Sequence, residues 1–234
     1  MKGKILAKNS NWTFGGKVAK KFDEHIKRSV PYYIEANNLV LELSDFFVSK
    51  NSYCYDIGSS TGNLLFNLNS RHKDKKIKFI GIDVEKDMIR HSNSKIKQNQ
   101  KNLKFVHNNI EKYRLKKSDL IISLYTMQFI SPKKRVAILK KIYDALNWGG
   151  AFIIFEKIRA PDARFQDLYS QIYNEFKLKE RHTPFEIINK SKSLKGILEP
   201  FSDAGNLKLL KTAGFIDITP IFQWVCFKGY ICIK

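Results

Sequence analysis

Short apolar runs alternate with amphipathic stretches from about residue 50 to the end of the chain. Several of the runs are continuously apolar, which is typical of parallel strands that helices cover on both faces. The runs predict strands at 52–57, 77–83, 103–107, 119–125 and 151–156. Between them, apolar residues recur at the period of a helix. The alternation therefore predicts an α/β fold with a mainly parallel sheet.

The clearest helical pattern covers 132–146, and Trp148-Gly149-Gly150 is expected to end it as a crossover turn. Near the C-terminus, the sequence predicts a further helix, a turn at Ala213-Gly214-Phe215 and two last strands, 216–222 and about 226–233. With these two strands, the expected sheet has seven strands. We expect helices on both faces of the sheet, as in Rossmann-like folds.

Helical segments also lie outside this alternation. Two amphipathic stretches, about 15–29 and 31–49, precede the sheet and are separated by Pro31. A long helical region over 163–198 comes before the last two strands. Open α/β sheets bind ligands at the carboxyl ends of their strands, so we expect this region to form a lid there.

The length and composition favour one globular domain. The chain has 234 residues, of which 43% are hydrophobic and 13% aromatic, enough for a substantial core. Within it, we expect residues 1–50 to form an N-terminal helical cap. Residues 51–234 would then form the ligand-binding part, with the lid at about 160–200.

The net charge of +20 permits two interpretations. A basic surface attracts RNA and other polyanions. The lysines, however, recur along the whole chain rather than in one block, which is also typical of solvated faces. The charge alone therefore leaves a role in tRNA binding open.

Several other classes of protein find no support in the sequence. No apolar run approaches the roughly 20 residues that span a bilayer, so we expect no membrane association. The histidines show no metal-ligand spacing, and we expect no metal site. Cys54, Cys226 and Cys232 lie in apolar segments and are expected to be reduced and buried, which favours a cytoplasmic protein.

One loop carries the strongest chemical signal. Asp56-Ile-Gly58-Ser-Ser-Thr-Gly62 joins a predicted strand to an amphipathic helix. The two glycines permit unusual backbone angles and let a ligand approach the main chain. The spacing differs from the G-x-G-x-x-G of dinucleotide folds and favours the S-adenosylmethionine (SAM) loop of class I methyltransferases. Glycines that merely end a strand are the alternative.

Further residues would converge on a SAM molecule in that loop. Asp83 ends the second strand and could bind both ribose hydroxyls, although a helix cap is the alternative. Asn109-Ile110 follows the third strand, where the adenine edge would lie, unless it is a plain turn. Tyr125 would lie near the sulfonium, which aromatic faces attract, or in the core. No catalytic base is identified, and Tyr33 and Tyr125 are candidates for positioning only.

Six segments support one more specific interpretation: Trp12-Thr-Phe14, Arg28-Ser-Val-Pro-Tyr-Tyr33, Tyr55-Asp-Ile-Gly-Ser-Ser60, Thr126-Met-Gln-Phe129, Lys141-Ile-Tyr-Asp-Ala-Leu-Asn-Trp-Gly-Gly150 and Phe222-Gln-Trp with Phe227 and Gly229. They resemble the bacterial carboxy-SAM synthases, and the resemblance covers nearly the whole chain from about residue 12. It implies the class I methyltransferase fold and a homodimer. It also implies synthesis of carboxy-SAM from SAM and prephenate, for wobble-uridine modification of tRNA.

The loop and the resemblance together imply a set of cofactor-binding residues: Tyr33, Asp56, Gly58, Ser59, Ser60, Gly62, Asp83, Val84, Asn109, Ile110 and Leu124. An asparagine of the family lines up with Leu124, which removes one polar contact. The family's carboxylate-binding arginine lines up with Ser191 in the lid, between Lys190 and Lys192. Serine cannot pair bidentately with a carboxylate as arginine does. The expected substrate-binding residues are these three together with Arg181 and His182.

The missing arginine decides which function the sequence favours. The leading hypothesis is a SAM-dependent methyltransferase that acts on an unidentified small-molecule acceptor, for which the basic residues of the lid make an anion plausible. The second is carboxy-SAM synthesis in which Lys190 or Lys192 replaces the arginine, although lysine and arginine are not equivalent at such sites. The third is a SAM- or RNA-binding adaptor without catalysis, which would bind tRNA with a steep salt dependence.

Overall fold

The computed structural model describes residue 14 and residues 17–234. Trp12 and Thr13, which contribute to the resemblance, lie outside the described residues. The chain forms one seven-stranded sheet in the order β3-β2-β1-β4-β5-β7-β6, in which only β7 runs antiparallel to its neighbours. The strands are β1 Tyr53–Ile57, β2 Lys78–Asp83, β3 Leu103–His107, β4 Ser118–Leu124, β5 Leu146–Lys157, β6 Asp217–Trp224 and β7 Phe227–Ile233.

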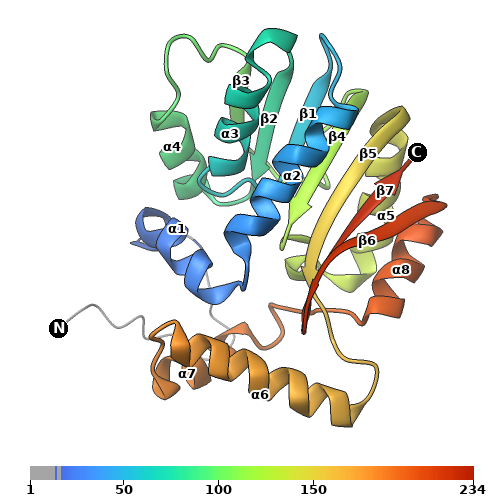
Figure 1. Ribbon diagram of the computed structural model, residues 1–234. Coiled ribbons are helices and arrows are strands. Elements are labelled where there is room, and N and C mark those ends of the chain that lie inside the picture. Colours follow the sequence, from blue (N-terminus) through green and yellow to red (C-terminus); the bar gives the residue numbers. More distant parts are fainter. Residues whose placement is uncertain (1–13, 15–16) are drawn as a thin grey trace.

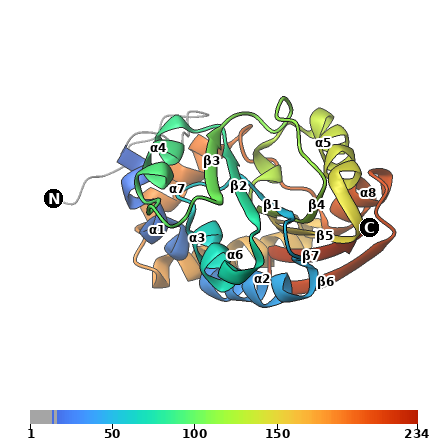
Figure 2. The same ribbon diagram turned by 90° about the horizontal axis from the view of Figure 1, so that it is seen from above.

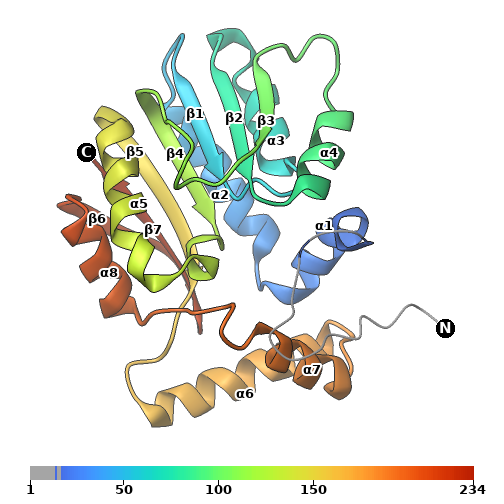
Figure 3. The same ribbon diagram turned by 180° about the vertical axis from the view of Figure 1, so that it is seen from behind.

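Helices cover both faces of this sheet (Figures 1 and 2). The helices are α1 Lys17–Ser29, α2 Tyr33–Phe47, α3 Asn63–Arg71, α4 Lys86–Ser94, α5 Pro132–Ala145, α6 Ala163–Lys179, α7 Pro184–Leu194 and α8 Asp203–Thr212, with short 3-10 turns at η1 Lys73–Lys75 and η2 Met127–Phe129. Helices α2 and α3 pack on one face, and α5 and α8 pack on the other, which faces the viewer in Figure 3. The predicted α/β architecture is confirmed.

The burial of the central strands explains their continuously apolar sequence. In β4, Ile121 and Ile122 are both fully buried, but they belong to the cores on opposite faces. Successive side chains of a strand point to opposite faces, so a strand covered on both sides needs apolar residues at every position. No helix in the described part of the chain has the length and apolar character needed to cross a membrane.

The glycine pair after α5 does not lie between elements as the sequence suggested. Strand β5 begins at Leu146 and includes both Gly149 and Gly150. The register between β4 and β5 shifts between Ser118 and Leu120, and the Gly149 amide donates a hydrogen bond to the Lys234 carbonyl. A positive φ of 74° at Gly149 permits this irregular start of the strand. The expected turn is therefore part of the sheet.

The helical region before the last two strands lies across the carboxyl ends of the parallel strands. It is divided into α6 and α7, because Thr183 and Glu186 form a capping box and Pro184 starts the second helix. Figures 1 and 3 place both helices below the sheet, beside α1. We call α6, α7 and the segment that follows to residue 202 the lid segment.

Hydrogen bonds tie the lid segment to the rest of the molecule at both ends. The Tyr173 hydroxyl on α6 donates to the Ser29 carbonyl at 2.7 Å, and Arg28 Nε donates to the Glu180 carbonyl at 2.7 Å. At the other end, the buried Arg135 donates to the Glu199 carbonyl at 2.7 Å. The lid segment therefore encloses the space between α1 and the sheet.

Candidate active site

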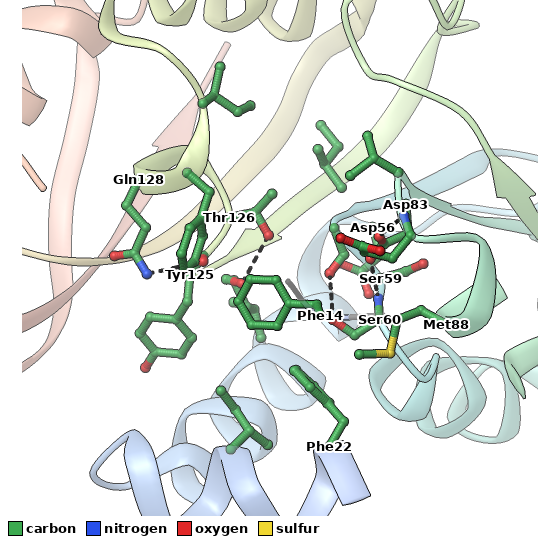
Figure 4. Close-up of a pocket in the computed structure, with 18 of the residues that line it drawn as sticks. Phe14, Phe22, Asp56, Ser59, Ser60, Asp83, Met88, Tyr125, Thr126 and Gln128 are labelled. Carbon is green, nitrogen blue, oxygen red and sulfur yellow. Dashed lines mark hydrogen bonds between the residues drawn. The ribbon is translucent and has the colours of Figure 1, made fainter. Parts of the chain in front are cut away.

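A pocket of about 420 Å³ lies between the carboxyl ends of the strands, α1 and the lid segment. This volume is in the range of small-molecule sites in proteins. Figure 4 shows its centre, where the β1–α3 loop faces the loop after β4. Of the residues predicted from the sequence, the following line it: Tyr33, Asp56, Gly58, Ser59, Ser60, Asp83, Val84, Asn109, Ile110, Leu124, Tyr125 and Lys190.

The β1–α3 loop turns sharply beneath this pocket. The Gly58 and Ser59 amides both donate to the Ile82 carbonyl of β2, at 2.7 and 3.2 Å. Gly58 has φ 78° and Ser60 has φ 47°, so two residues of the turn are in the left-handed region. Gly62, with φ 79°, is not a lining residue; it caps α3 against the Phe105 ring. The glycines thus shape the loop, as the spacing predicted.

Asp83 connects this loop to the end of β2. Its Oδ2 accepts the Ser60 amide at 2.8 Å, and its Oδ1 accepts the Glu85 amide at 2.8 Å. The side chain is buried, and burial raises the pKa of its carboxyl. Each oxygen keeps further capacity to accept hydrogen bonds. Asp83 can therefore hold the loop and also bind two hydroxyls of a ligand.

We expect Gly58→Ala to destabilise the protein by about 2–4 kcal/mol, because strain at positive φ and a core clash each cost of order 1–3 kcal/mol. A Cβ at this position would lie 2.0 Å from Thr126 Oγ1. Thermal unfolding measures the effect. The matched control is Gly196→Ala, which also has positive φ but has no atom within 4 Å of the added Cβ. Equal losses in the two variants would contradict a role for the Thr126 contact.

Aromatic and sulfur groups line the α1 side of the pocket. The Phe14 ring meets Phe129 edge-on at a centroid distance of 5.2 Å and lies 6.3 Å from Phe22, which packs with Met88. Figure 4 shows Phe14 projecting into the middle of the site, with Phe22 and Met88 beside it. Such an apolar wall suits a flat heterocyclic ring. Phe129 belongs to the strand exit whose aromatic groups the sequence places near the sulfonium, whereas Phe14, Phe22 and Met88 were not predicted as site residues.

A second aromatic group lies at the other end of the pocket. The Tyr125 ring is 6.3 Å from Tyr33, 6.0 Å from Phe155 and 5.9 Å from Phe227. Tyr125 has φ 57°, so its backbone is strained where β4 ends. Its hydroxyl is buried and has no hydrogen-bond partner among the described residues. This hydroxyl can therefore bond to a polar atom of a ligand in the pocket.

Of the three adjacent residues of the lid segment that were predicted to bind substrate, Lys190, Ser191 and Lys192, only Lys190 lines the pocket. Lys190 lines it and donates to Ser29 Oγ at 3.0 Å, with His25 Nε2 2.7 Å away. Ser191 and Lys192 are exposed and do not line the pocket. Successive residues of a helix point about 100° apart, so of these three residues α7 directs only Lys190 into the pocket. Arg181 and His182, between α6 and α7, do not line the pocket either.

Other lining residues give little signal in the sequence. His25 and Ser29 come from α1, Lys157 ends β5, and Tyr173 lies on α6. Each is an ordinary residue of an amphipathic helix or a strand end, so its role depends on how distant segments pack. Among the described residues, no group of three or more histidine, cysteine or acidic side chains could hold a metal ion.

Comparison with known proteins agrees with this geometry. Residues 55–150 match a methyltransferase domain model. A carboxy-S-adenosyl-L-methionine synthase of Staphylococcus epidermidis is 36% identical over 95% of this chain and 97% of its own length. A synthase of the same name from Campylobacter lari is 34% identical over the full length of both chains. The chain belongs to the carboxy-S-adenosyl-L-methionine synthase family.

Solved structures show the same fold at lower sequence identity. A SAM-dependent methyltransferase homologue of Methanococcus maripaludis superposes with a TM-score of 0.62 over 97% of this chain and 96% of its own, at 19% identity. Human N-acetylserotonin methyltransferase in complex with SAM gives 0.61 at 15% identity over 92% of this chain, which spans about half (54%) of that enzyme. The fold is thus that of the class I SAM-dependent methyltransferases.

As a member of this family, the chain is a SAM-dependent transferase with SAM as its cofactor. When bound, SAM supplies a methyl carbon attached to a positively charged sulfur. The pocket fits such a ligand, because buried hydroxyls of Ser59 and Tyr125 lack partners among the described residues. The buried carboxylates of Asp56 and Asp83 line the same pocket and suit the ammonium and ribose groups.

SAM affinity should rise with pH because of Asp56. Burial, and then the charge of Asp83, raises the pKa of the Asp56 carboxyl from 3.8 to about 7. A cationic ligand favours the ionised form, so SAM should bind roughly tenfold more tightly at pH 8 than at pH 6. Titration calorimetry across this range measures the change.

The stability of the ligand-free protein should change with pH in the opposite direction and fall as pH rises. Because the folded-state pKa of Asp56 is raised, its carboxyl favours folding while protonated, and that contribution is lost as pH rises from about 4 to about 7. Asp56→Asn should flatten both profiles. An unchanged pH dependence of SAM affinity in this variant would assign the effect to another group.

Proposed function

We propose that the chain makes carboxy-SAM, with a small anionic co-substrate such as prephenate as the source of the carboxyl group. Curated relatives with that name match along the whole chain at about one third identity. The sequence alone favours methyl transfer to an unidentified acceptor, with carboxy-SAM synthesis second. The full-length relatives support the second reading better than the first.

The position of Lys190 is the observation that carries this proposal. The objection from the sequence is that Ser191 stands where the family's arginine is expected. Lys190, one residue earlier, brings its ammonium group into the same pocket as the SAM loop. It can hold the added carboxylate as a point charge, without the bidentate geometry of a guanidinium. Lys192 is exposed, which makes it the weaker candidate.

The other predicted residues take roles in positioning SAM. Asp83 would bind the ribose hydroxyls, with Val84 beside it, and Asn109-Ile110 would contact the adenine edge. Asp56 and the Gly58-Ser59-Ser60 turn would face the methionine end, next to Leu124. Tyr33 and Tyr125 would flank the sulfonium, which aromatic rings attract. The lid segment excludes water and aligns the co-substrate, which supplies much of the rate in such reactions.

Incubation of the purified protein with SAM and prephenate tests the proposal. Mass spectrometry should detect carboxy-SAM, and native mass spectrometry should find SAM or carboxy-SAM already bound. Accumulation of S-adenosylhomocysteine with a methylated acceptor would instead support the methyltransferase hypothesis. Salt-dependent tRNA binding without any SAM binding would support the adaptor hypothesis.

The predicted homodimer, the tRNA pathway and the cytoplasmic location remain parts of the proposal. The lid segment supports a second copy as partner, because it exposes large apolar side chains: Phe165, Leu168, Ile172, Phe185 and Ile188. Large apolar side chains that are exposed on neighbouring helices are typical of contact surfaces when they form a contiguous patch. Light scattering after size exclusion should give twice the monomer mass of 27.3 kDa.

A further inference from the structure

Two lysines lie against one aromatic ring at the lid end of the pocket. Lys157 Nζ is 4.2 Å and Lys177 Nζ is 4.3 Å from the centre of the Tyr173 ring. Lys157 ends β5 and lines the pocket with Tyr173, whereas Lys177 follows Tyr173 by one turn of α6 and does not line it. An aromatic face attracts an ammonium group within about 6 Å. The ring therefore collects two positive charges, one of which faces the pocket.

The surroundings of these amines are positive. Among the described residues, no carboxylate forms a salt bridge with Lys157 or Lys177. Burial, and then Lys157, lowers the pKa of Lys177 to about 8. Burial, followed by Lys177 and Lys157, lowers the pKa of Lys190 to about 7. Collecting like charges in a partly buried space is unfavourable unless an anion joins them.

Hydrogen bonds fix the Lys157 backbone at the carboxyl end of β5. Its amide donates to Gln128 Oε1 at 2.7 Å, and the next amide, of Ile158, donates to the Cys226 carbonyl at 2.7 Å. The side chain then extends past Phe227, whose ring centre is 6.0 Å from Nζ, to Tyr173. A lysine held in this way loses little further conformational freedom when it binds a ligand.

We propose that Lys157, held by the Tyr173 ring, binds a carboxylate of the co-substrate in addition to the one that Lys190 binds. This inference rests on the proposed function, because it concerns the co-substrate of that reaction. Lys177, which does not line the pocket, strengthens the positive potential at the ring without touching the ligand. Two separate amines match prephenate, which carries two carboxylate groups, better than they match an acid with only one.

The test compares Lys157→Met, Lys157→Arg and Lys177→Met with the wild type. Lys157→Met should raise the KM for prephenate by about 10- to 100-fold, the usual effect of losing one charged hydrogen bond. Its SAM affinity should stay within about threefold of the wild-type value, since SAM binds elsewhere in the pocket. Lys157→Arg should have a KM for prephenate between those of the wild type and Lys157→Met. Lys177→Met should raise this KM by less than about fivefold. Thermal unfolding of each variant tests whether it is folded.

A binding measurement separates this inference from the proposed function. Prephenate is titrated calorimetrically into the SAM complex of the wild type and of Lys157→Met. Weaker binding to the variant supports the Lys157 site even if the wild type makes no carboxy-SAM, in which case the proposed function alone fails. Equal binding, or an equal KM in a variant that forms carboxy-SAM, overturns the Lys157 site and leaves the proposed function intact.

Discussion

Asp83→Ala should reduce SAM affinity by about 100-fold or more. The carboxylate accepts the Ser60 and Glu85 amides and so fixes the β1–α3 loop that lines the pocket. It is also the acid that faces the pocket at the end of β2. Hydrogen bonds to a charged group contribute about 1.5–3 kcal/mol each, and 1.4 kcal/mol is a factor of ten in affinity. If Asp83 binds both ribose hydroxyls as proposed, the loss of these two hydrogen bonds alone lowers SAM affinity by about 100-fold, without any change in the loop.

Titration calorimetry with SAM measures this loss, and two further variants separate its causes. Asp83→Asn keeps one acceptor oxygen, and its SAM affinity should lie between that of Asp83→Ala and that of the wild type. Asp144→Ala removes an exposed carboxylate on α5 that pairs only with Lys140 among the described residues, and it should bind SAM normally. A SAM dissociation constant for Asp83→Ala within about threefold of the wild type would show that Asp83 only shapes the loop.

Local patterns predicted the sheet and the sharp turn after β1 because both depend on short stretches of chain. Buried parallel strands need apolar residues at every position, and the turn after β1 needs glycine at a positive φ. Asp83 follows from the same logic, since the strand that it ends lies beside β1. These features could be read from sequence because strand order and spacing determine them.

The lid end of the pocket could not be predicted in this way. Tyr173 bonds to Ser29, and Lys190 bonds to the same residue, across 144 and 161 positions of sequence. No period in the sequence indicates which helix faces reach that point. The choice among Lys190, Ser191 and Lys192 likewise depends on how α7 is rotated about its axis. Only packing between distant elements determines these contacts.

Lys190→Met should lower the rate of prephenate-dependent carboxy-SAM formation by about 100-fold, with SAM affinity within about threefold of the wild type. Lys190 is the residue of the three candidates that lines the pocket, and Ser29 and His25 hold its amine. Burial lowers the pKa of this amine to about 7, so the free pocket can hold it neutral. A carboxylate beside it favours the charged form, and methionine cannot supply that charge.

The matched control is Lys192→Met, which removes an exposed lysine two positions away and should leave the rate unchanged. Lys190→Arg tests whether a guanidinium group at this position can replace the amine. We expect partial activity, because the guanidinium group is larger and binds a carboxylate bidentately. Product formation is followed by mass spectrometry at saturating SAM. Full activity of Lys190→Met, or an equal loss in Lys192→Met, would remove Lys190 from the reaction. The serine at position 191 would then leave the pocket without a replacement for the family's carboxylate-binding arginine. Methyl transfer would become the better-supported function of this protein.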